Sequence, residues 1–241
     1  MIGFYARQAR ALVGLGRLTD VTRILDEALS TPYASAPPVG GEFIPLDQCD
    51  AGQVLCLVSM DLRTHGHAPE ALATARRAVG WFEARPASEK QALSSRWLLA
   101  LAKYLAEDWE GARVLYEPLA NLARPVRPPG WSEEGAFLLT VRFRGRLGVI
   151  AARRGDRAAA QRIARDLEQV DHPYLYGEHW YQRAAIAAQL GERDGAVALL
   201  REAIAQGFTD VAGYAESFHR APEMAPLRGY PPFEELVKPK G

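Results

Sequence analysis

A short phrase recurs along the chain, and each copy has the composition of a turn between two helices. An apolar-periodic stretch ends at a glycine, or once at a glutamate, and polar residues then lead into a new helical pattern. That order of residues is typical of a helix stop, a turn and a helix start. The sequence therefore predicts five helix–turn–helix units. Their turns lie at residues 15–20, 65–70, 107–110, 154–157 and 190–194.

Small and apolar residues keep fixed distances from these turns when positions 16, 66, 107, 155 and 191 are treated as equivalent. Seven positions earlier every unit has a small residue, five positions later a small or β-branched residue, and twelve positions later an apolar residue. Small side chains at fixed offsets on both helices allow the helices to approach closely. The three columns are Ala9, Ser59, Ala100, Gly148 and Ala184; Val21, Ala71, Ala112, Ala160 and Ala196; and Ala28, Ala78, Leu119, Leu167 and Ala203.

The same periodicity predicts an all-α protein. No stretch alternates apolar and polar residues with β-branched enrichment, so no strand is expected. Ser88 and Ser132 are predicted helix N-caps. The predicted helices cover residues 4–15, 19–30, 48–65, 69–84, 89–106, 109–123, 132–154, 157–169, 176–190 and 193–206.

Charge and cysteine content exclude several classes of protein. The chain has 29 basic and 29 acidic residues, whereas broad nucleic-acid or membrane-surface binding needs a surplus of positive charge. No signal peptide and no apolar run of about 18 residues is present, so no membrane insertion is expected. Cys49 and Cys56 are predicted to be reduced core residues, which favours a reducing compartment. The expected location is the cytoplasm.

The aligned columns resemble the tetratricopeptide repeat family. Its pattern has a small residue midway along the first helix, a glycine at the turn, and alanine, a bulky residue and alanine on the second helix. Ala75 and Ala164 depart from the bulky position. The intervals between turns are 50, 41, 48 and 36 residues, against about 34 in the standard repeat. The resemblance implies a right-handed α-solenoid of about five helix pairs over residues 1–207.

The C-terminal residues resemble the closing segment of repeat regions in bacterial signalling proteins, such as serine/threonine kinases, cyclases and transcriptional regulators. The likeness rests on Leu227-Arg228-Gly229 and on the Pro-x-Phe at residues 231–233. It implies that residues 208–241 form a capping tail on the last repeat. It also leaves open whether the natural chain is longer at its N-terminus. If the chain is a fragment of a membrane-anchored signalling protein, an extracytoplasmic location is also open.

Residues for chemistry are sparse. No pair of histidines or cysteines has the spacing of metal ligands, and no nucleophile motif or phosphate-binding loop is present. The five histidines are expected in turns or on the surface. The sequence therefore predicts no catalytic residue, no metal and no cofactor, and it does not predict an enzyme.

In tetratricopeptide arrays the first helix of each pair lines the concave face, and the resemblance carries this role onto nine positions. The set is mostly basic and aromatic, which suits an extended peptide with acidic groups, although packing between helices is the alternative explanation for the aromatic residues. The nine are Arg10, Gln53, Arg63, Trp97, Tyr104, Arg142, Arg153, Glu178 and Tyr181.

The expected function is a non-catalytic, regulatory scaffold or adaptor whose concave groove binds a peptide or a partner domain. Two alternatives remain. A helical sensor would hold a small molecule between its helices. A self-assembling protein would use an apolar face of the N-terminal helix pair, around Ile2, Phe4 and Leu12.

Overall fold

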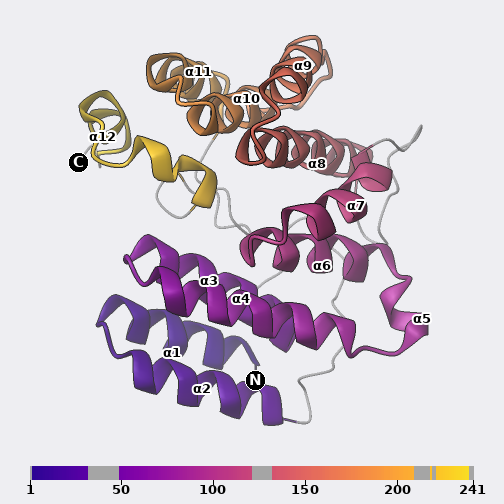
Figure 1. Cartoon of the computed structure of the whole chain (residues 1–241), viewed down its shortest axis with the longest axis vertical. Helices are drawn as coiled ribbons and strands as arrows, with labels where there is room; N and C mark the ends of the chain where they lie inside the picture. The colour runs from indigo at the N-terminus through magenta and orange to yellow at the C-terminus, as the bar shows by residue number, and fades with distance from the viewer. Residues whose placement is uncertain (1, 32–48, 121–131, 209–217, 219–220, 239–241) are drawn as a thin grey trace. The chain divides into compact units, whose positions relative to one another are not determined.

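A computed structural model describes residues 2–31, 49–120, 132–208, 218 and 221–238. This part of the chain is all helical: it contains thirteen helices, one of them a 3-10 helix, and no strand (Figure 1). All ten helices expected from the periodicity are present, which confirms the predicted all-α class. None of the helices in the described residues is long and apolar enough to cross a bilayer.

The chain forms two compact units, and each has its own core. The first unit runs through Leu115 and is built mainly from α1 (Ile2–Gly14), α2 (Leu18–Ser30), α3 (Ala51–Thr64), α4 (Ala68–Glu83), α5 (Ala87–Lys90) and α6 (Leu93–Leu105). The pairs α1–α2 and α3–α4 each pack together, and α3 also contacts α1 and α6. The boundary between the units falls inside α7 (Trp109–Ala120).

The second unit contains the end of α7 together with α8 (Glu133–Arg153), α9 (Arg157–Glu168), α10 (Glu178–Gln189), α11 (Arg193–Ala205), the 3-10 helix η2 (Pro222–Leu227) and α12 (Pro231–Val237). Here α8–α9 and α10–α11 form the sequential pairs, and α8 also packs against α10. The C-terminal elements lie on the last pair, η2 against α10 and α12 against α11. Gln189 of α10 donates a hydrogen bond to the backbone carbonyl of Glu223, 2.6 Å away.

The five predicted turns have one geometry. At each aligned position the residue has a positive φ and donates its N–H to the carbonyl three residues earlier. The next residue donates to the carbonyl five residues earlier, with all ten N···O distances between 2.9 and 3.2 Å. This is the Schellman arrangement, which satisfies carbonyls left unpaired at a helix end. The five residues are Gly16, Gly66, Glu107, Gly155 and Gly191. Gly207 ends α11 in the same way.

The three sequence columns mark buried positions where neighbouring helices pack. All fifteen residues in them are buried. Gly148 shows why the column stays small: a Cβ at that position would lie 2.3 Å from Cδ1 of Ile186, a side-chain atom of α10. The alignment of the five units, made on spacing alone, therefore matches the packing.

Side chains cap the N-termini of α8 and α3. Ser132 accepts a hydrogen bond from the N–H of Gly135 at 3.0 Å, which confirms the predicted cap of α8. Asp50 and Gln53 form a reciprocal capping box on α3. The prediction for Ser88 was wrong. Ser88 lies inside the four-residue helix α5, because the chain turns into a helix directly after Pro86.

Candidate functional site

The nine residues predicted for a binding face divide between the two units. Five of them lie in the first unit and four in the second. Arg153 is exposed at the C-terminal end of α8, and Trp97 of α6 is half-buried. The remaining seven take part in contacts within their own unit or are buried there.

Three arginines of the set join consecutive first helices. Arg10 of α1 pairs with Asp61 of α3. Arg63 of α3 pairs with Glu107 in the turn after α6, at 2.7 Å. Arg142 of α8 pairs with Glu178 of α10, at 3.0 Å. Each ion pair therefore links two successive helix pairs and neutralises the arginine's charge, so these side chains hold neighbouring helices in register.

The other four members of the set are buried. Gln53 belongs to the capping box of α3, and Glu178 accepts hydrogen bonds from both Arg142 and Gln182. Tyr104 packs edge-on against Trp109, with ring centroids 5.5 Å apart. Tyr181 is fully buried and stacks on Phe208, with centroids 4.4 Å apart. In this structure these four side chains therefore contribute to packing and capping rather than to an open surface.

The N-terminal helix pair has an exposed apolar side, as the self-association alternative requires. Phe4 and Leu15 expose most of their side chains, whereas Leu12 is buried against its own unit. The side chain of Ile2 lies outside the described residues.

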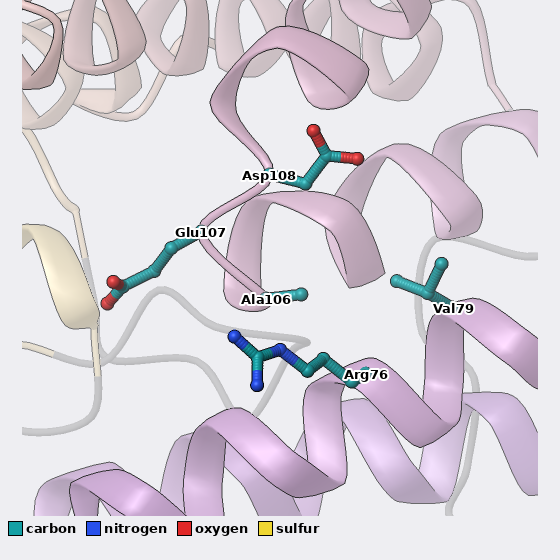
Figure 2. A pocket seen from close by; sticks show the side chains of 5 residues that line it. All are labelled: Arg76, Val79, Ala106, Glu107 and Asp108. Atoms are coloured by element: carbon teal, nitrogen blue, oxygen red, sulfur yellow. The ribbon is translucent and has the colours of Figure 1, made fainter.

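A cleft of about 370 Å³ lies in the first unit, between α4 and the turn that joins α6 to α7. Arg76 and Val79 line it from one turn of α4, and Ala106, Glu107 and Asp108 line it from the loop (Figure 2). Figure 2 shows the guanidinium of Arg76 directed toward the loop, and the carboxylates of Glu107 and Asp108 directed to different sides of it. The cleft therefore combines one cation, two carboxylates and two small apolar side chains.

Most charges around the cleft are neutralised by neighbours. Lys103 of α6 bridges Glu83 at 2.8 Å and Asp108 at 3.2 Å. Partial burial alone would lower the pKa of Lys103, but the hydrogen bonds and attraction of these two carboxylates outweigh it and raise the pKa. Glu107 is paired with Arg63. Arg76 makes no hydrogen bond or ion pair with the described chain, so it is the charge that is free to meet an anionic group.

The backbone at the cleft is strained at one residue. Glu107 has φ of +61°, the position that glycine occupies in the other four turns. A left-handed conformation costs a residue with a Cβ roughly 1–2 kcal/mol. Strained residues of this kind persist where the surrounding structure holds them, and they gather at functional sites. The missing glycine was visible in the sequence. The cleft could not be seen in the sequence, because it forms only where α4 lies beside the turn that joins α6 to α7.

The described residues contain no group of three or more histidine, cysteine, aspartate or glutamate side chains placed to hold a metal ion. Cys49 and Cys56 form no disulfide and are buried, as predicted. The expectation that the histidines lie in turns or on the surface was wrong for His179, which lies in α10 and is buried. Burial, together with the nearby Arg183, lowers its pKa.

No protein-family model, curated protein sequence or solved structure matches this chain. The geometry of the helix pairs and of the cleft therefore carries the functional argument.

Proposed function

We propose that this chain is a non-catalytic protein–protein interaction module, folded as a right-handed tetratricopeptide-like solenoid of about five helix pairs with a C-terminal cap. The observation that supports the proposal best is the equivalence of the five turns. One hydrogen-bond pattern recurs at each aligned position, and the same three columns are buried in every pair. Repeats of this kind build extended surfaces that bind a peptide or a partner domain.

Adjacent first helices support the same proposal. In the first unit α3 contacts both α1 and α6, and in the second unit α8 contacts α10. The arginine–carboxylate pairs fix these neighbours at a set register. A surface that is held in place before binding loses little conformational entropy when a partner arrives. The module is therefore suited to a regulatory or scaffolding role.

The test is capture of a partner from a lysate of the source organism, followed by reconstitution with the purified partner. Arg76→Glu changes the cleft and Arg153→Glu changes the exposed end of α8. Arg201→Glu is the matched control, because Arg201 is an exposed arginine on the second helix of the last pair. We expect at least one of the first two variants to weaken the measured affinity about tenfold or more and the control to change it less than twofold.

A small-molecule sensor is the second candidate, and the cleft is the observation that favours it. Its volume of about 370 Å³ lies within the range of ligand sites, roughly 300–1,000 Å³. Thermal-shift measurements with carboxylate-bearing metabolites separate the two functions. A ligand that raises the melting temperature of the wild type but not of Arg76→Glu, together with no captured protein, would support the sensor and contradict the interaction module.

A further inference from the structure

The turn between α9 and α10 holds two tyrosines in a backbone conformation that tyrosine rarely adopts. Tyr174 has φ of +66° and Tyr176 has φ of +46°. Residues with a Cβ avoid this region for steric reasons, and a bulky side chain there is an outlier. Residues 171–177, with the sequence Asp-His-Pro-Tyr-Leu-Tyr-Gly, are called the tyrosine turn below.

The rest of the second unit fixes the tyrosine turn in place. Leu175 is buried between the two tyrosines, and its carbonyl accepts a hydrogen bond from the N–H of Glu178 at 2.8 Å. The ring of His172 stacks on Phe137 of α8, with centroids 3.9 Å apart. Gly177 has φ of +76°, and a Cβ there would lie 2.2 Å from the carbonyl oxygen of Ala203. The strained backbone is therefore held at both ends.

The two rings nevertheless point to solvent. Tyr174 is 58% exposed and Tyr176 is 57% exposed, and their centroids are 6.1 Å apart. Among the large exposed apolar side chains of the described residues, these two alone have a left-handed backbone. Packing within the unit holds the strained backbone in place, but it gives no reason for two exposed rings at these positions. An outlier of this kind points to a function outside the fold, and rigid tyrosines are frequent at the centres of interfaces.

The charge around the tyrosine turn is negative. Residues 165–177 contain three acids and one arginine, in a chain whose total charge is zero. Glu168 is paired with Arg183 at 3.0 Å. Asp166 and Asp171 make no hydrogen bond or ion pair with the described chain, and Asp171 begins the turn itself. A cationic side chain docked here would therefore find two exposed aromatic rings and an unneutralised carboxylate.

We propose that the tyrosine turn is a docking point for an arginine- or lysine-bearing segment of a protein partner. The proposal rests on the interaction function proposed above and names the chemistry of the partner at one place. Two arginines of this chain already use aromatic faces in the same way. Arg85 lies 4.5 Å from the ring centroid of Trp81, and Arg183 lies 4.4 Å from that of Trp180.

The test uses the full chain and a defined probe, the peptide acetyl-Gly-Arg-Gly-Arg-Gly-amide, followed by NMR of ¹³C-labelled tyrosine. Tyr174→Phe and Tyr176→Phe assign the two signals and keep the rings. We expect saturable shifts at Tyr174 and Tyr176, and an affinity that changes less than about twofold in the phenylalanine variants. The double variant Tyr174→Asn/Tyr176→Asn removes the rings, while asparagine tolerates the left-handed backbone. Because this variant lacks both reporter tyrosines, its affinity and that of the wild type are compared by isothermal titration calorimetry. Its affinity should fall at least about fivefold, with the melting temperature unchanged or higher.

Two controls decide the outcome. The same peptide with glutamate in place of arginine should give no saturable shift, and Asp171→Asn should weaken binding of the arginine peptide. Equal binding to the double asparagine variant, equal binding of the glutamate peptide, or no shift at either tyrosine would each overturn the docking point. If a captured protein partner binds the double asparagine variant as tightly as the wild type, the interaction function stands and this docking point fails.

Discussion

Asp50 of the first unit is a buried carboxyl group whose pKa is strongly shifted in the folded chain. Its side chain is 2% exposed and accepts the N–H of Gln53 at the start of α3. Burial raises the pKa of Asp50 from 3.8 to about 7, against the opposing effects of the Gln53 and Gly52 N–H groups and of Arg85. The folded chain therefore holds this proton over a pH range in which the unfolded chain has lost it.

This carboxyl group makes stability depend on pH. The pKa of Asp50 is higher in the folded chain than in the unfolded chain. Its contribution to the free energy of unfolding is therefore fully present below about pH 4 and is lost as pH rises through about 7. Asp50→Asn keeps a side-chain oxygen for the cap and removes the proton. We expect the variant to gain stability relative to the wild type between pH 4 and 8, on the order of 3 kcal/mol.

Urea denaturation at pH 4, 5.5, 7 and 8, followed by circular dichroism, measures this difference. The control is Asp194→Asn, which changes an exposed aspartate of α11. A constant difference between wild type and Asp50→Asn over the whole pH range would show that Asp50 stays ionised in the fold.

Two glycines that border helices have a left-handed backbone, but they differ in the space around them. Gly155, in the turn after α8, has φ of +81° and no atom within 4 Å of a Cβ built on it. Gly177, before α10, has a similar φ of +76°, but its Cβ would lie 2.2 Å from the backbone oxygen of Ala203. Backbone strain is common to both positions, whereas a steric clash is specific to Gly177.

Substitution by alanine separates these two effects. Gly155→Ala should cost about 1 kcal/mol of unfolding free energy, since only the backbone preference is lost. Gly177→Ala should cost at least about twice as much, because the carbonyl of Ala203 cannot move without disturbing the end of α11. Chemical denaturation at one pH measures the loss of unfolding free energy in each variant. Equal losses would mean that the contact between Gly177 and Ala203 relaxes freely.

Local sequence was enough to predict elements, because turns and caps depend on neighbouring residues. Gly16 and Ser132 could be assigned from a few positions around them. The carboxylate partners of Arg10, Arg63 and Arg142 could not be assigned from local sequence. These partners, Asp61, Glu107 and Glu178, lie 36 to 51 residues away along the chain. Periodicity placed Tyr181 on a first helix but could not show that Phe208 and Phe218 bury it.

The tyrosine turn was not predicted for a different physical reason. Non-glycine residues are expected to have negative φ, so nothing in the local sequence indicates that Tyr174 and Tyr176 adopt the left-handed region. Their conformation depends on contacts from α8 and α11, which hold His172 and Gly177. The candidate sites therefore lie where tertiary contacts override local preference, and helix periodicity does not find such places.

At the scale of the whole molecule, the two units have separate cores. Leu62 is buried in the first unit and Leu167 in the second. Removing either side chain leaves a cavity in one core, and such truncations cost about 2–5 kcal/mol. We expect Leu62→Ala to raise hydrogen exchange mainly in α1–α4, and Leu167→Ala mainly in α8–α11. Mass-spectrometric hydrogen exchange of both variants measures this. An equal rise throughout the chain for either variant would contradict separate cores.

The arginine–carboxylate pairs between successive first helices also have a mechanical meaning. Each ion pair joins residues that are 36 to 51 positions apart and so closes one segment of the chain. The pairs are Arg10–Asp61, Arg63–Glu107 and Arg142–Glu178. The three segments do not overlap in sequence. Under tension along the chain, breaking one ion pair therefore releases only the residues between its own two partners. Since attraction between partly exposed charges weakens as salt rises, the contribution of these ion pairs to the resistance against force falls as ionic strength rises.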